Sequence, residues 1–335
     1  MTNTSTASTT MRAIVQETYG NADVLHLARI ARPESAANEV LVRVHAAGLD
    51  RGTWHLMTGR PYLGRLVFGM RRPKNPVPGL DVAGTVVAVG SAVTRFSVGD
   101  EVFGFGRGTF AEYTVAREGK LARKPVNLSF EQAAVVPVSA ATALQALDAV
   151  GPDAPRHTVL VVGASGGVGS YAVQLAKAFG AEVTGVASTG KLPLVRSLGA
   201  DHVIDYTRED FADGRHRYDV ILDIAGNPTL TRLRRALTRT GTAVIVGGEE
   251  GGSFSGGMNR PLRGLALSPF LRQRFTNFIA KQRSGDLERL TELIEADKLM
   301  PSIDRTYPLE EVPEAMRRLE AGEVRGKVAI AVQVT

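Results

Sequence analysis

The sequence of 335 residues contains no cysteine, which excludes disulfide bonds and every metal site that depends on thiolate ligands. A chain without cysteine is compatible with a reducing compartment, so we expect a cytoplasmic protein. The chain also lacks the basic start and the apolar core of a secretory signal, because residues 1–10 are mainly serine and threonine. We expect residues 1–10 to form a disordered tail.

Long apolar runs and aromatic clusters are missing as well. The most apolar window, residues 133–150, falls short of the roughly 20 apolar residues that a membrane-spanning helix needs. It is interrupted by Pro137, Ser139, Thr142, Gln145 and Asp148. Basic residues cluster only briefly, at 71–74 and 232–235, and no aromatic residue stands among them. The net charge of +6 is explained equally well by solvated faces or by a phosphate-bearing small ligand, which argues against a nucleic-acid partner. We expect no membrane partner either.

Two kinds of sequence pattern divide the chain. Between Met11 and about Lys124, short β-type runs alternate with glycine-rich turns, which is typical of a compact, mostly antiparallel β domain. From Ser129 onward strands alternate with helices, which predicts a parallel sheet with right-handed crossovers. The last strand, residues 327–332, returns to the first pattern. The second domain is therefore predicted to be inserted into the first.

The elements of the inserted domain have clear signals at their ends. Ser129 is a candidate N-cap for helical residues that break at Pro137. Gly180 is expected to end a helix, and Asn227 to cap a helix whose first residue is Pro228. The strands are predicted at 158–162, 182–187, 202–205, 219–225, 242–247 and 274–280, and the helices at about 168–179, 190–198 and 228–238.

A glycine-rich turn in the segment VLVVGASGGVGS, residues 159–170, joins a buried strand to a helix. The dinucleotide fingerprint places glycines at the first, third and sixth positions of such a turn, which here are Ala164, Gly166 and Gly169. Glycines in a helix cost about 1 kcal/mol each, so three of them within four residues suggest close approach to a ligand. We interpret the turn as a phosphate cradle, and the alternative is a tight turn with no ligand.

The residues after the second strand indicate which dinucleotide is bound. A NAD site carries Asp or Glu there for the ribose 2′-hydroxyl, and residues 186–191 contain no carboxylate. Ser188, Thr189 and Lys191 offer hydroxyls and a cation for a 2′-phosphate, and Tyr206 follows the third strand. We therefore predict NADP(H) as the cofactor. The alternative is that Lys191 is an ordinary surface lysine.

Several separated motifs resemble the medium-chain dehydrogenase/reductase superfamily, and most of all its zinc-free, quinone-oxidoreductase-like branch. They are VPGLDVAGTVVAVG (77–90), EQAAVVPVSAATALQAL (131–147), GASGGVGSYAVQLAKAFGAEV (163–183) and LVRSLGADHVIDY (194–206). The resemblance covers residues 11–333. It implies an α/β fold in which a GroES-like, mostly β catalytic domain, residues 11–132 and 282–335, holds an inserted Rossmann domain, residues 133–281. It also implies a homodimer.

The resemblance further implies cofactor contacts for individual residues. The 2′-phosphate would meet Ser188, Lys191 and Tyr206, which the residues themselves also suggest. The pyrophosphate would meet Gly166, Gly167, Val168 and Gly169. The nicotinamide end would meet Thr142, Ala225, Val246, Gly247 and Gly248.

Three positions depart from the zinc alcohol dehydrogenases of the same superfamily. Their catalytic GHE motif falls on residues 79–81, so Leu80 replaces a histidine ligand and Asp81 replaces the glutamate. Their first cysteine ligand falls on Asp50. The six histidines show no HxxxH or comparable ligand spacing. We expect no metal.

A site without a Lewis acid needs a substrate that is itself electrophilic. We therefore predict hydride transfer from NADPH to the β-carbon of a quinone or an α,β-unsaturated carbonyl, with the developing charge stabilised by hydrogen bonds. Asp50, Trp54 and Tyr62 are the candidate catalytic residues, and they are expected to position the substrate rather than react. Asp50 is equally well interpreted as a structural hydrogen-bonding residue, and Tyr62 as a packing residue.

Two other classes of protein are alternatives to this hypothesis. A short-chain reductase needs a Tyr-x-x-x-Lys pair, and none of the seven tyrosines is followed by lysine at that spacing. The sequence leaves open a non-catalytic NADPH-binding protein of the same fold, either a redox sensor or an RNA-associated protein.

Overall fold

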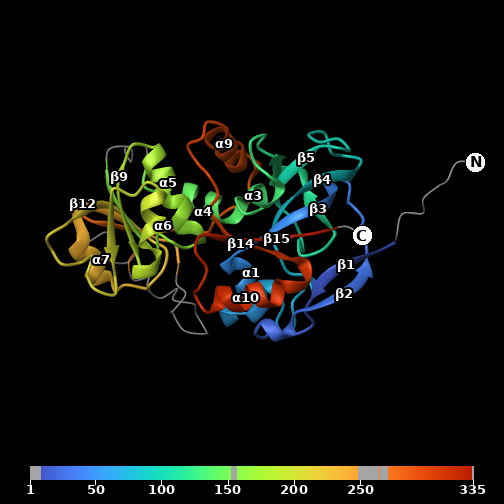
Figure 1. Ribbon diagram of the computed structural model, residues 1–335, viewed down its shortest axis with the longest axis horizontal. Helices are drawn as coiled ribbons and strands as arrows, with labels where there is room; N and C mark the ends of the chain where they lie inside the picture. The colour runs from blue at the N-terminus through green and yellow to red at the C-terminus, as the bar shows by residue number, and fades with distance from the viewer. Residues whose placement is uncertain (1–8, 152–156, 248–263, 265–270, 334–335) are drawn as a thin grey trace, which may run out of the picture.

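Two large β-sheets organise the part of the chain that this computed structural model describes, residues 9–151, 157–247, 264 and 271–333 (Figure 1). The six-stranded sheet and its helices lie on the left in Figure 1, and the seven-stranded sheet lies on the right. Strands β14 (Ile303–Pro308) and β15 (Lys327–Ala331) lie at the centre, where β15 pairs with β3 (Glu39–Leu49). The last strands of the chain therefore complete a sheet that begins near residue 39.

The six-stranded sheet is parallel throughout and has the order β10-β9-β8-β11-β12-β13. Its strands are β8 (Thr158–Val162), β9 (Glu182–Ala187), β10 (His202–Asp205), β11 (Tyr218–Asp223), β12 (Leu237–Ile245) and β13 (Arg274–Asn277). Counted along the chain this is the order 3-2-1-4-5-6 of a Rossmann sheet, in which ligands bind outside the carboxyl ends of the strands where the order reverses. That point lies between β8 and β11.

The predicted strands of this sheet are confirmed. Three of them, β8, β9 and β10, occupy the predicted residues. Strand β11 spans Tyr218–Asp223 instead of 219–225, β12 spans Leu237–Ile245 instead of 242–247, and β13 ends at Asn277 instead of 280. The early start of β12 extends its parallel pairing with β11, where Tyr218 lies opposite Leu237. Pairing with a neighbour therefore set this boundary, and the local sequence pattern could not show it.

The seven-stranded sheet has the order β14-β15-β3-β4-β5-β7, and β6 pairs with β3. All its pairings are antiparallel except that of β14 with β15. Its remaining strands are β4 (Asp81–Val89), β5 (Glu101–Phe105), β6 (Tyr113–Arg117) and β7 (Leu121–Arg123), and a separate hairpin consists of β1 (Thr10–Val15) and β2 (His26–Ala31). The domain limits at 132 and 282 remain predictions.

Short helices cover the sheets and connect their strands. None of the helices in the described ranges is long and apolar enough to cross a membrane. In the continuous described ranges, 9–151, 157–247 and 271–333, the α-helices are α1 (Arg51–Thr58), α2 (Arg65–Phe68), α3 (Phe130–Ala134), α4 (Pro137–Asp148), α5 (Gly167–Ala178), α6 (Leu192–Ser197), α7 (Leu230–Ala236), α9 (Ser284–Glu295) and α10 (Val312–Glu320). The 3-10 helices are η1 (Ala22–Val24), η2 (Tyr62–Gly64), η3 (Glu118–Lys120), η5 (Thr189–Lys191) and η7 (Leu309–Glu311).

Two of the three helix-end residues predicted from the sequence, Ser129 and Gly180, are confirmed. Ser129 caps α3 in a capping box, in which its Oγ accepts from the Gln132 amide at 3.2 Å and its own amide donates to Gln132 Oε1 at 2.9 Å. Pro137 begins α4, which confirms the predicted break. Gly180 follows the end of α5 with φ +86°, a conformation that favours glycine.

The predicted start of α7 is wrong by two residues. Asn227 does not cap the helix and instead takes a left-handed conformation with φ +42°. The N-cap is Thr229, whose Oγ1 accepts from the Arg232 amide at 3.3 Å, so Pro228 lies before the helix. Both residues can act as caps, and the turn after β11 decides between them.

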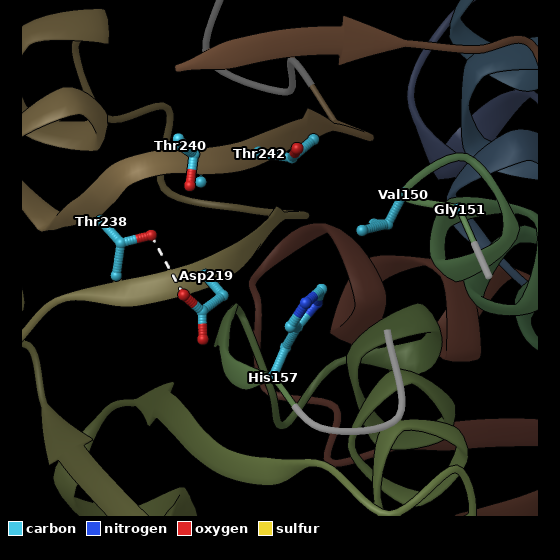
Figure 2. Close-up of a pocket in the computed structure, with 8 residues that line it drawn as sticks. Val150, Gly151, His157, Asp219, Thr238, Thr240 and Thr242 are labelled. Atoms are coloured by element: carbon cyan, nitrogen blue, oxygen red, sulfur yellow. Dashed lines mark hydrogen bonds between the residues drawn. The ribbon is translucent and has the colours of Figure 1, made fainter. Parts of the chain in front are cut away.

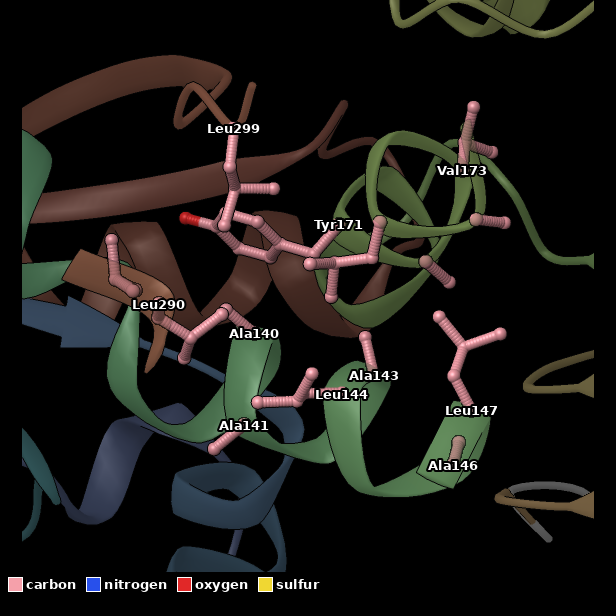
Figure 3. Close-up of a cluster of buried hydrophobic side chains, with 14 of the residues drawn as sticks. Ala140, Ala141, Ala143, Leu144, Ala146, Leu147, Tyr171, Val173, Leu290 and Leu299 are labelled. Carbon is pink, nitrogen blue, oxygen red and sulfur yellow. The ribbon is translucent and has the colours of Figure 1, made fainter. Parts of the chain in front are cut away.

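Helices α4 and α5 pack closely because α4 presents alanines to its neighbour. Figure 3 shows Ala140 and Ala143 on the side of α4 that faces α5, and the ring of Tyr171 from α5 next to Leu299. Tyr171 is fully buried, and its hydroxyl donates to the Val135 carbonyl at 3.1 Å. This contact fixes the beginning of α5, which carries the glycine turn, against the segment that joins the two sheets.

Candidate functional site

A cavity of about 820 Å³ lies between the two sheets and receives residues from both. Its walls include the turn after β8, the first turn of α5, the end of β9, the turn after β11, one side of α1 and part of α4. The C-terminal residues 322, 324, 326 and 327 also line the cavity. The cavity therefore opens at the carboxyl ends of β8 and β11, where a Rossmann sheet binds its ligand.

The glycine turn has the geometry of a phosphate cradle. Gly166 is the N-cap of α5 and has no side chain to cap the helix, so the first turn is open to an acceptor from the cavity. A Cβ on Gly166 would meet only the Gly163 carbonyl oxygen, at 3.5 Å, which leaves room for a ligand. A helix N-terminus of this kind binds phosphate through its free N–H groups and its dipole. The residues thus fit a dinucleotide.

The alanine at the first fingerprint position is compensated by its neighbour. Gly163 carries the positive φ of the turn, +86°, and a Cβ there would come within 2.8 Å of the Ala225 Cβ. Ala164 is fully buried with ordinary backbone angles. The last glycine, Gly169, serves packing, because a Cβ on it would lie 2.1 Å from the Gly163 carbonyl oxygen. Gly169 does not line the cavity, whereas Gly166, Gly167 and Val168 do.

The residues predicted to meet a 2′-phosphate are brought together in part. Ser188, Lys191 and Tyr206 line the cavity beyond the end of β9. The Lys191 ammonium donates to the carbonyls of Gly322 at 2.7 Å and Val324 at 2.9 Å. Burial lowers the pKa of Lys191, and the nearby Arg325 guanidinium lowers it further. Thr189 does not line the cavity, and its hydroxyl donates to the Asp205 carboxylate.

The predicted nicotinamide contacts also lie in this cavity. Thr142, Ala225, Val246 and Gly247 are among its lining residues. The Thr142 hydroxyl donates to the Val138 carbonyl one helical turn earlier at 2.6 Å. Gly248 lies outside the described residues.

Of the three catalytic candidates, the structure places only Asp50 in the cavity. Asp50 caps α1, because its Oδ1 accepts from the Thr53 amide at 2.8 Å. Its Oδ2 is buried and makes no hydrogen bond, although Asp50 lines the cavity. Both interpretations of Asp50, as a structural residue and as a site residue, are therefore compatible with its position.

Trp54 and Tyr62 are not among the lining residues. Helix α1 turns Arg51, Gly52 and His55 toward the cavity, and Trp54 packs against the hydrophobic core of the seven-stranded sheet instead. Tyr62 is 41% exposed, and its ring lies 4.6 Å from the Arg65 guanidinium. Arg51 and His55 are one turn apart and share the face toward the cavity, whereas Trp54 packs on the core although it lies four residues after Asp50, so helical spacing alone did not predict its position.

A buried polar group at the floor of the cavity was not predicted from the sequence. The Lys327 ammonium, 1% exposed, donates to Ser139 Oγ at 2.9 Å and lies 3.8 Å from Asp81 Oδ2. Asp81 is fully buried, and its Oδ1 accepts from the Val138 amide at 2.9 Å. Burial raises the pKa of the Asp81 carboxyl well above its usual range, the Asp50 carboxylate raises it further, and Lys327 opposes both effects. The sequence signal that could have revealed this group is a lysine, Lys327, at the start of the otherwise apolar strand β15.

A second, smaller cavity of about 210 Å³ lies at the opposite ends of the strands. It is lined by His157, Asp219 and threonines of β12 (Figure 2). The Asp219 carboxylate accepts from the Thr158 amide at 3.1 Å and from the Thr238 hydroxyl at 3.1 Å. These bonds connect the amino ends of three neighbouring strands, so we interpret Asp219 as a structural residue.

Two family models match the chain. The alcohol dehydrogenase GroES-like domain matches residues 36–126, and the zinc-binding dehydrogenase model matches residues 198–330. Within the residues that the structure describes, no group of three or more His, Cys, Asp or Glu side chains is placed to hold a metal ion.

Individual relatives match over nearly the whole chain. A 2-methylene-furan-3-one reductase from Solanum lycopersicum is 36% identical over 96% of this chain and 79% of its own length. A chloroplastic NADPH-dependent alkenal/one oxidoreductase from Arabidopsis thaliana is also 36% identical over the same shares. The structure of a quinone oxidoreductase from Coxiella burnetii superposes with a TM-score of 0.85 at 30% identity, covering 97% of this chain and all of the other.

Replacing Lys327 by Met should destabilise the protein by about 3–5 kcal/mol, because a buried carboxyl group loses its counter-charge. Since the folded pKa of Asp81 is raised, its contribution to stability is present below the unfolded pKa of about 3.9 and is lost as pH rises. Removing Lys327 raises that pKa further. The loss should therefore be small near pH 4 and grow toward neutral pH, as measured by urea unfolding.

Two variants make this test specific. The double variant Asp81→Asn/Lys327→Met should recover part of the stability at neutral pH, because it buries no unpaired charge. The exposed Lys298→Met is the control and should change the unfolding free energy by less than about 0.5 kcal/mol. A loss that is the same at every pH would show that Lys327 does not compensate Asp81.

Proposed function

This chain belongs to the medium-chain dehydrogenase/reductase superfamily, and we propose that it is an NADPH-dependent oxidoreductase of quinones or α,β-unsaturated carbonyls. The relatives support this proposal, since they include a furanone reductase, an alkenal/one oxidoreductase and a quinone oxidoreductase. One observation carries it. The phosphate-binding turn, the residues for a 2′-phosphate and a polar floor all open into a single cavity.

The cavity provides a separate position for each part of the cofactor. The 2′-phosphate would meet Ser188, Lys191 and Tyr206, while Thr189 would act through Asp205. The diphosphate would meet the first turn of α5. Lys327 adds a positive charge there, because a Cβ on Gly167 would lie 3.2 Å from the Lys327 Cδ. The nicotinamide end would lie between Thr142 and the backbone at Ala225, Val246 and Gly247.

The chain's own residues would position the substrate and control one proton. When bound, the cofactor supplies a hydride to the electron-poor carbon of the substrate. Asp50 holds α1 through Oδ1, its Oδ2 is buried without a hydrogen-bond partner, and the residue lines the cavity. Two buried carboxyl groups near each other disfavour a double negative charge, so Asp50 and Asp81 together are suited to hold the proton that follows the hydride. Trp54 and Tyr62 would act only by fixing α1 and the segment after it.

We also propose that the reaction needs no zinc, since Leu80 and Asp50 occupy the positions of two ligands in the zinc enzymes and the chain has no cysteine. A chelator should then leave turnover unchanged. The homodimer, the cytoplasmic location and the absence of a nucleic-acid partner remain predictions.

The function is tested by mixing the protein and NADPH with a benzoquinone, a naphthoquinone, an alkyl vinyl ketone and a 2-alkenal. We expect loss of NADPH absorbance with at least one of them, and no reduction of NADP⁺ with an unactivated primary alcohol. Tight NADPH binding without turnover of any acceptor would contradict the proposal and favour a redox sensor.

Replacing Lys191 by Ala should weaken NADPH binding by about 1.5–3 kcal/mol, because a charged hydrogen bond to the 2′-phosphate is lost. The affinity for NADH should stay the same, since NADH carries no such phosphate. Calorimetric titration with both cofactors measures the difference, and Lys298→Ala is the control. Equal losses for the two cofactors would contradict a 2′-phosphate contact.

Asp50→Asn and Asp50→Ala separate the capping role of this residue from its role in the cavity. Asparagine keeps a cap acceptor, so Asp50→Asn should leave stability nearly unchanged but lower turnover on the order of 10²-fold. Asp50→Ala should also lose about 0.5–2 kcal/mol of stability. Ser129→Ala removes another cap and should lower stability without changing turnover. Full turnover in Asp50→Asn would make Asp50 a cap only.

A further inference from the structure

One segment of the chain has an unusual charge composition. Residues 51–80 contain six basic residues and no aspartate or glutamate, although the whole chain has 34 acidic residues among 335. Four of these cations, Arg60, Arg71, Arg72 and Lys74, are exposed and make no ion pair within the described ranges. Some exposed arginines elsewhere, such as Arg289, face a carboxylate, and others in the described ranges, such as Arg29 and Arg239, do not, but there acidic residues occur in the same stretches of chain. The segment therefore presents uncompensated positive charge.

The same segment exposes large apolar side chains. Leu63, Leu66, Val67, Phe68 and Met70 are 41%, 66%, 67%, 38% and 64% exposed. With Tyr62 they account for six of the thirteen large hydrophobic residues that the described chain exposes. We call residues 62–74 the basic–apolar patch. Exposed apolar groups concentrated in this way mark a surface that another molecule covers.

The backbone of the patch is held in place while these side chains point outward. The Arg65 Nε donates to the Gly59 carbonyl at 2.9 Å, and its guanidinium lies 4.5 Å from the Tyr19 ring. The Tyr19 hydroxyl donates to the Gly69 carbonyl at 2.7 Å, and the Lys74 amide donates to the Phe68 carbonyl at 2.8 Å. The exposed apolar groups therefore sit on an ordered base.

We propose that the basic–apolar patch docks this protein onto an anionic lipid bilayer. Apolar side chains that insert at the headgroup boundary, flanked by arginine and lysine, are the chemistry that binds such a surface. A second copy of the chain fits less well, because a two-fold contact places the same patch on both sides and sets cations against cations. This departs from the expectation of no membrane partner, which the sequence supported only by the lack of a spanning run.

The basic–apolar patch lies next to the cavity in the chain, which relates membrane docking to the proposed reaction. The segment leaves the cavity wall at α1, where Arg51, Gly52 and His55 line it, and its last residue, Leu80, lies beside Gly52. A lipophilic quinone that leaves the bilayer would meet the cleft directly. This last step rests on the proposed function, whereas lipid binding does not.

The test is co-sedimentation of the full chain with vesicles of phosphatidylcholine alone or with phosphatidylglycerol in equal parts. We expect binding to the anionic vesicles that weakens with added salt. Arg71→Glu/Arg72→Glu should lower the partition coefficient by about 25-fold or more, because each cation near the surface contributes roughly a fivefold effect. Leu66→Asp/Val67→Asp should lower it by about tenfold or more.

Matched variants elsewhere on the surface are the controls. Arg29→Glu/Arg239→Glu carries the same change of charge, and Val126→Asp/Ile279→Asp changes side chains that are 86% and 89% exposed. Both should bind like the parent protein, and thermal unfolding checks that all variants fold. Equal binding by patch and control variants, or no binding to anionic vesicles, would overturn the proposal. So would patch variants that turn a dimer into a monomer in a protein that does not bind vesicles. Because the assay contains no substrate, a protein without reductase activity can still confirm lipid binding.

Discussion

A lysine ammonium loses its hydration when it is buried, and the protein has to replace what water supplied. Lys327 is 1% exposed, and Ser139 and Asp81 provide a hydrogen bond and an opposing charge. These three residues come from β15, α4 and β4, which belong to both halves of the molecule or connect them. The energetic need to satisfy one buried cation therefore fixes the floor of the cleft and the relative position of its walls.

The same requirement shapes the electrostatics of the site. The first turn of α5 and Lys327 both present positive charge to the cavity, and Asp50 is the only acidic residue among its described lining residues. An anionic dinucleotide would be attracted to that end of the cleft. The Asp50 and Asp81 carboxyl groups lie near each other behind it, and burial raises the pKa of Asp81. The cavity thus combines a position that suits a phosphate with a neighbouring pair of carboxyl groups that suits a proton.

Helix α1 links the interior chemistry to the surface of the protein. Asp50 begins the helix and places Arg51, Gly52 and His55 along the cavity wall. The chain then emerges as the basic–apolar patch and comes back beside α1 at Leu80, next to Gly52. A substrate that is soluble in lipid would thus find the surface patch and the cleft in one continuous stretch of about thirty residues.

The sequence by itself determined the local structure and the outline of the fold. Strands β8 to β10, the N-cap at Ser129 and the break at Pro137 depend on neighbouring residues, so their patterns predicted them. The glycine turn could be predicted for the same reason, because all the residues that form it lie within a stretch of seven. Only the tertiary structure decided which side chains reach the cavity. It brought Lys327 to Ser139 across 188 positions, turned Trp54 and Thr189 away, and moved the start of α7 to Thr229. Such contacts depend on how distant segments pack, and burial and charge compensation act only after the chain has folded.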